Sequence, residues 1–208
     1  MIRLDRQDRL WRVTIARPDK ANSLSRAMLT ELARIAEQAQ DAGLCAFVLT
    51  GEGRVFSAGA DLEEARAGLA TDPVWERLSA AIAALPCLSI AALNGTLAGG
   101  AFGMALACDL RIAVRSARMF YPVMRLGFLP QPSDPVRLCA LVGPARARMI
   151  LMAGARIGAE EALSWGLVDR VAEDGALDAA IDELMADALS ATPAHVAAIK
   201  RMIPAGGA

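Results

Sequence analysis

The sequence predicts an α/β fold in which mainly parallel strands are covered by helices on both sides. Short apolar runs bounded by turn residues, such as 46–50 and 88–93, are typical of strands that are buried on both faces. Segments in which apolar residues recur at helical spacing alternate with these runs over the first two-thirds of the chain. The last third contains helical patterns only.

The individual elements begin at local signals. Residues 10–15 alternate as a strand, and Ser25 is expected to be the N-cap of a helix that ends by Gly43. Asp61 and Glu64 have the spacing of a capping box, which predicts another helix start. Further strands are expected at 46–50, 88–93, 109–114 and 118–120, and further helices at 72–84, 99–107, 134–142, 145–153, 159–165, 176–190 and 194–202.

The composition indicates a globular chain and excludes several classes of function. The 208 residues are 55% apolar, and 22 basic against 23 acidic residues leave a net charge of −1. Neither disorder nor a nucleic-acid or membrane surface is expected, because the apolar content is high and no block of like charge occurs. The single histidine, His195, excludes a histidine-rich metal centre, and no metal site is predicted; we expect His195 at the surface or at an interface.

The cysteines and the first residues favour a cytoplasmic location. The four cysteines, at 45, 87, 108 and 139, lie among apolar neighbours and outside metal-site spacing, so buried reduced thiols are expected. The N-terminal residues lack the apolar segment of a signal peptide. The longest apolar runs are well below the ~20 residues that span a bilayer.

Two predicted strand-to-helix junctions, at 56–62 and 94–101, are rich in small residues. Small residues let a ligand approach the backbone, and the first N–H groups of a helix have no partner within it. If the junctions converge, one N–H from each can hold a single carbonyl oxygen that gains negative charge. Ordinary close packing of helices on strands is the alternative interpretation.

A series of motifs extends over residues 10–171 in a fixed order. They are RPDKANSL at 17–24, VLTGEGRVFSAGADL at 48–62, the segment 94–109, LG at 126–127 with Pro130, VG at 142–143 and AEEALSWGLV at 159–168. In this order and spacing, the motifs resemble those of the enoyl-CoA hydratase/isomerase (crotonase) family.

The resemblance implies a spiral of ββα units, usually assembled as trimers or dimers of trimers, that binds acyl-CoA thioesters. Family members stabilise an enolate-type oxyanion with two backbone amides, and these map onto Ala60 and Gly100. Coenzyme A enters as part of the substrate, and no tightly bound cofactor is implied. The resemblance places coenzyme A along Lys20, Ala21, Asn22, Leu24, Ala58, Asp61 and Leu62. For the Asp61 side chain, a simple helix cap is the alternative.

Two positions depart from the family pattern. Hydratases of the family carry glutamates at the positions of Gly103 and Val123, and isomerases usually retain the second one. Glycine and valine transfer no protons, so ordinary hydratase chemistry is not expected. Tyr121 and Asp134 are the candidate catalytic replacements; a half-buried strand position for Tyr121 and a helix cap for Asp134 are the alternatives.

The sequence therefore predicts a protein that binds an acyl-CoA thioester and stabilises an enolate, as an isomerase, a decarboxylase or a thioester hydrolase. A non-catalytic acyl-CoA-binding or scaffold subunit of the same fold is the alternative, and an ordinary hydratase whose glutamates are supplied elsewhere is the third hypothesis. Residues 1–171 are expected to form the spiral core. Residues 172–208 are expected to be a short C-terminal helical segment, because family members usually continue with further helices.

Overall fold

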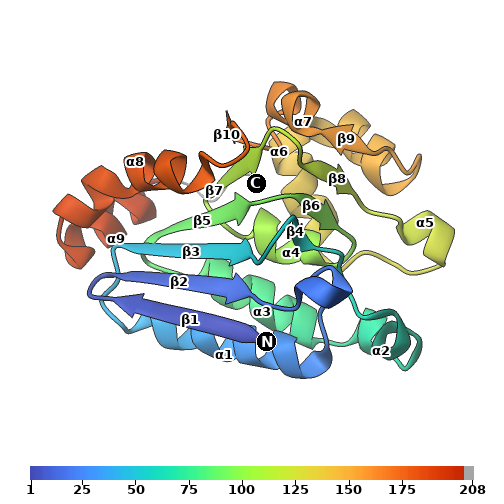
Figure 1. The fold of residues 1–208 in the computed structure, drawn as a ribbon, viewed down its shortest axis with the longest axis horizontal. Helices are drawn as coiled ribbons and strands as arrows, with labels where there is room; N and C mark the ends of the chain where they lie inside the picture. The colour runs from blue at the N-terminus through green and yellow to red at the C-terminus, as the bar shows by residue number, and fades with distance from the viewer. Residues whose placement is uncertain (204–208) are drawn as a thin grey trace.

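The structure is a computed structural model that describes residues 1–203, and it contains two sheets surrounded by helices (Figure 1). The larger sheet has the strand order β1-β2-β3-β5-β7-β10, and the smaller sheet has the order β4-β6-β8-β9. The strands are β1 Ile2–Gln7, β2 Leu10–Ile15, β3 Ala46–Gly51, β4 Val55–Ser57, β5 Leu88–Leu93, β6 Thr96–Ala98, β7 Leu110–Val114, β8 Arg118–Phe120, β9 Ile157–Gly158 and β10 Arg170–Ala172.

Helices cover both sides of the larger sheet. Figure 1 shows α1 and α3 below this sheet and α8 above it. The α-helices are α1 Arg26–Gln40, α2 Leu62–Arg66, α3 Val74–Ala83, α4 Ala101–Leu106, α5 Val123–Leu126, α6 Ser133–Leu151, α7 Ala159–Trp165, α8 Leu177–Ser190 and α9 Pro193–Met202; short 3-10 turns occur at η1 Pro18–Lys20 and η2 Leu69–Thr71.

Successive units of the chain repeat one path through the two sheets. A long strand enters the larger sheet, a short strand enters the smaller one, and a helix follows, as in β3-β4-α2, β5-β6-α4 and β7-β8-α5. The strands β3, β5 and β7 pair in parallel, and so do β4, β6 and β8. The predicted α/β class and the spiral of ββα units are therefore confirmed.

The predicted helix caps are largely confirmed. The Ser25 hydroxyl accepts a hydrogen bond from the N–H of Met28 at 3.2 Å, and α1 begins directly after Ser25. The Asp61 carboxylate accepts from the N–H of Glu63 at 3.1 Å and begins α2. The reciprocal half of the capping box is absent, because Glu64 instead accepts from the backbone N–H of Arg26 at 2.7 Å. Glu64 thus joins the starts of two helices.

Several short elements were not predicted. The sequence gives no signal for the edge strand β1, whose six residues are mostly exposed, or for the short strands β4, β6, β9 and β10. Strands of two or three residues are too short to show a period. The helices expected at 134–142 and 145–153 meet at Gly143, where a φ of 77° breaks the helical geometry within α6.

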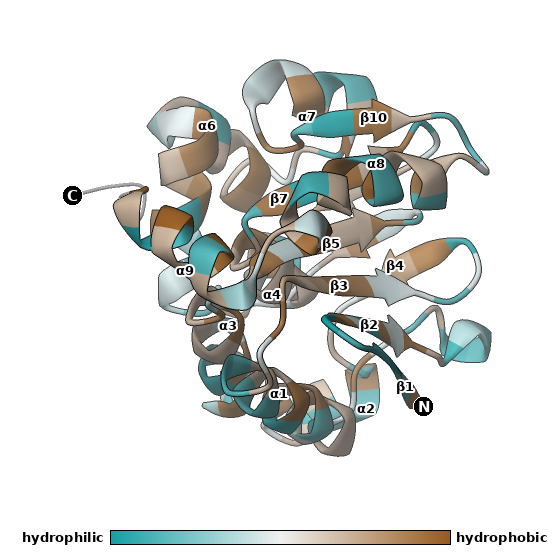
Figure 2. Cartoon of the chain, turned by 90° about the vertical axis from the view of Figure 1, so that its left-hand side faces the viewer, coloured by the Kyte–Doolittle hydropathy of each residue, from teal (hydrophilic) through white to brown (hydrophobic). Residues whose placement is uncertain are grey.

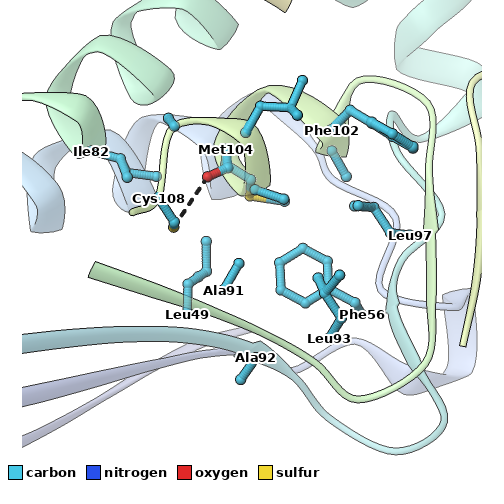
Figure 3. Packing of buried hydrophobic residues seen from close by; sticks show 14 of the residues in the cluster. Leu49, Phe56, Ile82, Ala91, Ala92, Leu93, Leu97, Phe102, Met104 and Cys108 are labelled. Atoms are coloured by element: carbon cyan, nitrogen blue, oxygen red, sulfur yellow. Dashed lines mark hydrogen bonds between the residues drawn. The ribbon is translucent and has the colours of Figure 1, made fainter. Parts of the chain in front are cut away.

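The core lies between the larger sheet and the helices around it. Figure 2 shows hydrophobic residues concentrated on β5 and β7, whereas β1 at the edge is hydrophilic. In Figure 3, Phe56 of β4 lies among Leu93 of β5, Leu97 of β6 and Met104 of α4. This packing fixes the junction that follows β4 against the one that follows β6.

The expected thiol state and surface histidine agree with the structure. All four cysteines are free, and three of them are buried. His195 is exposed at the start of α9. Within residues 1–203, no helix is long and apolar enough to cross a membrane. The same residues contain no cluster of three or more histidine, cysteine or acidic side chains that could hold a metal ion.

Candidate active site

The two junctions of small residues lie against each other. A Cβ added to Gly59 would lie 3.3 Å from the backbone nitrogen of Gly100, and one added to Gly99 would lie 3.7 Å from the Cα of Gly59. Both Gly59 and Gly99 have a positive φ, at 91° and 57°. Glycine is therefore needed at both positions for conformation, and at Gly59 also for space. The two junctions therefore converge, as they must if one N–H from each is to hold a single carbonyl oxygen.

Leu24 and Ala60 form a single parallel β-bridge. This pairing directs the N–H of Ala60 away from the segment that contains Leu24. The N–H of Leu24 donates to the carbonyl of Gly59 at 2.8 Å, and the N–H of Asp61 donates to the carbonyl of Leu24 at 2.9 Å. In this pattern the two hydrogen bonds belong to the residues on either side of Ala60, so its own N–H points to the opposite side.

Two backbone donors remain free beside one pocket. Neither Ala60 nor Gly100 donates its N–H to a backbone acceptor within the described residues 1–203. Both residues line the same pocket, which is also lined by Ala58, Leu62, Ala65, Ala70, Trp75, Gly99, Tyr121, Pro122, Val123, Leu126, Phe128, Leu129 and Gln131. Both residues are half-buried at the pocket wall, where the oxygen of a bound ligand can accept from their N–H groups.

The pocket wall is mostly apolar, and the Trp75 ring in it is held by a hydrogen bond. None of the lining side chains carries a charge, and Val123 stands in the wall at one of the two positions where the sequence departs from the family pattern. The Trp75 indole N–H donates to the carbonyl of Leu69 at 2.8 Å. This bond holds the indole ring in place, at 3.2 Å from where a Cβ on Gly100 would be. Residue 100 therefore has little room for a side chain.

The segment 20–24 runs alongside the first junction, as the resemblance implied. The N–H of Ala58 donates to the carbonyl of Ala21 at 3.0 Å. The Asn22 side chain is fully buried and donates to the carbonyls of Glu52 and Val55, so it holds the loop in place. Lys20 and Ala21 are exposed next to this contact, whereas Leu24 is buried. The structure thus brings together the residues expected along coenzyme A.

The Asp61 side chain has a structural role. Its carboxylate caps α2 and forms an ion pair with Arg17 at 2.9 Å. Partial burial opposes ionisation, but the hydrogen bonds from Arg17 and from the backbone lower the pKa of Asp61 below its usual value. The helix-cap alternative for this side chain is confirmed. The adjacent Leu62 is 61% exposed and contributes its side chain to the pocket.

Tyr121 and Asp134 form a buried pair beside the pocket. Tyr121 directly follows β8, and its hydroxyl donates to Asp134 Oδ2 at 2.8 Å. Asp134 is only 1% exposed, and its other carboxylate oxygen, Oδ1, has no hydrogen-bond partner within the described residues. The alternative interpretation, that Asp134 caps the next helix, is wrong. Glu76 of α3 occupies that role instead, since it accepts from the N–H and the hydroxyl of Ser133.

The Asp134 carboxylate occupies the space that Gly103 leaves empty. A Cβ on Gly103 would lie 2.7 Å from Asp134 Oδ1, which is closer than real Cβ contacts come. The missing side chain at residue 103 and the carboxylate at residue 134 are therefore one arrangement. The sequence showed both residues, but it gave no signal that they touch.

Burial changes the protonation of this pair. It raises the pKa of Asp134 to about 7, and the charge of Glu76 acts in the same direction. The Tyr121 hydrogen bond and the Arg137 charge lower the pKa again but do not reverse the shift. The pKa of Tyr121 is raised, by burial first and then by Asp134. At neutral pH, Asp134 is therefore divided between its acid and carboxylate forms, while Tyr121 stays protonated.

The fold and this pocket define a class of protein that comparison with known proteins identifies. The sequence profile of the enoyl-CoA hydratase/isomerase family matches residues 5–206. The solved structure of Pseudomonas aeruginosa DspI superposes with a TM-score of 0.87 at 34% identity, covering 96% of this chain and 84% of that one. A Thermobifida fusca protein described as an enoyl-CoA hydratase, solved in complex with CoA, has the same TM-score and identity, with coverages of 96% and 82%.

Among curated proteins, 4-chlorobenzoyl coenzyme A dehalogenase-2 of Arthrobacter is 35% identical over 94% of this chain and 74% of its own length. YngF of Bacillus subtilis, whose name assigns it to the enoyl-CoA hydratases and isomerases, is 40% identical over 76% of this chain. The alignment covers 64% of YngF, less than two-thirds of that protein. The chain belongs to the enoyl-CoA hydratase/isomerase family.

Replacing Gly103 with alanine is expected to destabilise the wild-type fold but not a variant without the carboxylate. Alanine normally favours a helix over glycine by about 1 kcal/mol. Here its Cβ would collide with the buried carboxylate of Asp134, so G103A should lower the free energy of unfolding by about 1–3 kcal/mol. In a D134A background, the same substitution should be neutral or stabilising. Chemical denaturation of the four proteins measures the coupling; equal effects of G103A in both backgrounds would contradict this contact.

The raised pKa of Asp134 is expected to make stability depend on pH. The folded chain holds the proton up to about pH 7, whereas the unfolded chain releases it near pH 4. This contribution is fully present below pH 4 and is lost as the pH rises to about 7. Its size is about 4 kcal/mol at most. The free energy of unfolding of the wild type should therefore fall relative to that of D134N across this range. A pH-independent difference would show that Asp134 is not protonated in the fold.

Proposed function

We propose that this chain is an acyl-CoA thioester enzyme that stabilises an enolate. The carbonyl oxygen of the thioester would accept hydrogen bonds from the N–H groups of Ala60 and Gly100. The observation that carries the proposal is that these two donors are free and line one pocket. Donors that are already oriented favour an oxygen as it gains negative charge, because they need no rearrangement during the reaction.

The same geometry supports a position for the coenzyme. The exposed residues Lys20 and Ala21 lie beside the junction that contributes Ala60, through the contact of Ala21 with Ala58. We propose that the CoA portion runs along this edge, and that the acyl group enters the pocket past Leu62. The family membership and the CoA complex of a neighbour with the same fold support this direction.

The pocket favours a neutral, apolar acyl group. Its lining contains no charged side chain, so a second carboxylate on the substrate would be buried without a partner, which is costly. This argues against decarboxylation of a malonyl-type thioester. Hydration of a double bond is disfavoured as well, because Val123 in the wall offers no second acid–base group. We propose proton transfer next to the thioester carbonyl, as in an isomerase, with Tyr121 of the lining and its hydrogen-bond partner Asp134 as the nearest acid–base groups.

Two parts of the proposal rest on the sequence alone, the assembly on the family resemblance and the location on the cysteines and the first residues. Assembly into trimers or dimers of trimers stays a prediction, and so does the cytoplasmic location. The alternative function, a non-catalytic subunit that binds acyl-CoA, needs the same pocket but no proton transfer. Turnover therefore separates the two functions, whereas binding does not.

Removing the N–H of Gly100 is expected to abolish most of the activity. Proline has no N–H, and the φ of −58° at Gly100 suits its ring. G100A is the matched control, because it also adds a Cβ against Trp75 but keeps the N–H. Exchange of the protons next to the carbonyl of hexanoyl-CoA in D2O should fall about 100-fold or more in G100P relative to G100A.

Equal exchange rates in G100P and G100A would contradict the oxyanion role of this amide. Circular dichroism and thermal unfolding of both variants establish that each retains the fold. A wild-type chain that binds hexanoyl-CoA but shows neither exchange nor turnover with any apolar thioester would support the non-catalytic alternative.

A further inference from the structure

We infer that the pocket selects a neutral acyl group with a hydroxyl at its far end, and that Gln131 recognises this hydroxyl. The inference rests on the proposed function, since it takes the thioester oxygen to lie between Ala60 and Gly100. It adds the class of acyl group and the residue that selects it. Three observations carry it: an unpartnered amide oxygen in the pocket wall, the bond that orients it and its separation from the oxyanion amides.

One polar side chain in the pocket wall keeps an unused hydrogen-bond acceptor. Among the lining residues, only Trp75, Tyr121 and Gln131 carry a nitrogen or an oxygen in their side chains. The Trp75 N–H donates to the carbonyl of Leu69, and the Tyr121 hydroxyl donates to the buried Asp134. Gln131 uses its Nε2 as a donor, but its Oε1 accepts no hydrogen bond within residues 1–203. This oxygen is therefore available to a ligand.

The unpartnered oxygen can be reached from the pocket. Gln131 is only 8% exposed, and it lines the pocket. Within the described part of the chain, Asp134 Oδ1 is the side-chain atom that is both enclosed and unpaired, so Gln131 Oε1 keeps a surface of its own. A ligand that fills the pocket contacts the side chain of Gln131.

A hydrogen bond across the pocket orients the amide of Gln131. Its Nε2 donates to the carbonyl of Ala70 in η2 at 2.9 Å. A carbonyl accepts from an N–H and repels a second oxygen, so this bond determines which end of the amide carries Oε1. The bond also restricts the side chain before a ligand binds, which lowers the entropy lost on binding. What remains is a fixed acceptor that needs a donor.

Gln131 lies away from the oxyanion amides, on the other side of the Trp75 ring. The six-membered ring of the indole lies against Gly100, with atoms at 3.2 Å from the place of a Cβ on that residue. The indole N–H, at the other edge of the ring system, reaches the carbonyl of Leu69, which precedes Ala70. The width of the indole thus separates Gly100 from the backbone that holds Gln131. We therefore expect Oε1 to meet the far part of an acyl group.

The chemistry of the wall limits the donor to a neutral group. No lining residue is charged, so an ammonium group would be buried without a counter-ion. A carboxylate would bring a second acceptor to Oε1 of Gln131. A hydroxyl supplies one proton and no net charge. An acyl group without a donor would displace water from Oε1 and leave it unpaired, so the hydroxylated group is favoured over the plain one.

The test compares two pairs of thioesters that differ by one hydroxyl. They are 6-hydroxyhexanoyl-CoA with hexanoyl-CoA, and 3-(4-hydroxyphenyl)propanoyl-CoA with 3-phenylpropanoyl-CoA. By isothermal titration calorimetry, the wild type should bind the hydroxylated member of at least one pair about tenfold or more tightly. Q131M keeps the length of the side chain but carries no amide oxygen, so it should lose this preference.

Q40M is the matched control. Gln40 also donates its Nε2 to a backbone carbonyl, that of Ala81 at 3.1 Å, but it does not line the pocket. Q40M should therefore keep the preference of the wild type. Because the preference is a ratio of two affinities measured on one protein, a similar loss of stability in both variants leaves it unchanged.

The outcomes separate this inference from the proposed function. Equal affinities within both pairs in the wild type, or a preference that Q131M retains, would overturn the role of Gln131 and leave the oxyanion site intact. A preference that Q40M loses as well would also overturn it. A preference that only Q131M loses supports the inference. If that wild type exchanges no protons next to the thioester carbonyl, the result overturns the proposed catalysis and not the selection by Gln131.

Discussion

The site depends on how one short segment, residues 57–61, is held on both of its sides. On one side, the bridge between Leu24 and Ala60 uses the N–H and carbonyl groups that flank Ala60 and leaves its own N–H free. On the other side, Gly59 packs against residues 98–100, where a Cβ on Gly59 would lie 2.9 Å from the carbonyl oxygen of Ala98 and 3.3 Å from the nitrogen of Gly100. The parallel pairing of β4 with β6 keeps the two junctions in this register. The two free donors thus follow from the fold, without any special side chain.

The sequence was sufficient for the elements that bury a recognisable face. The long strands β3, β5 and β7 and the N-caps Ser25 and Asp61 were predicted because apolar runs and capping side chains are local signals. The smaller sheet was mostly missed, since β4 and β6 have only three residues each. The glycines and alanines of the site were noticed as small residues, but their convergence depends on strand pairing across the fold, which only the family resemblance implied.

The Asp134 pair shows where local analysis fails. An aspartate between two prolines near a helix start indicates a cap, and a glycine at residue 103 indicates a lost catalytic group. In the structure, Glu76 of another helix takes the capping role, and the carboxylate of Asp134 instead fills the space above Gly103. Two features that looked like an unrelated loss and an ordinary cap are a single contact between residues 31 positions apart. Such a contact has no signature in a single sequence.

A structure of the chain with a bound apolar acyl-CoA analogue tests the central claim most directly. The account expects the carbonyl oxygen of the thioester within about 2.7–3.1 Å of the backbone nitrogens of both Ala60 and Gly100. It also expects the acyl group to lie in the apolar pocket, against Leu62, Trp75 and Val123. A thioester whose carbonyl oxygen lies out of hydrogen-bond reach of both amides would contradict the account.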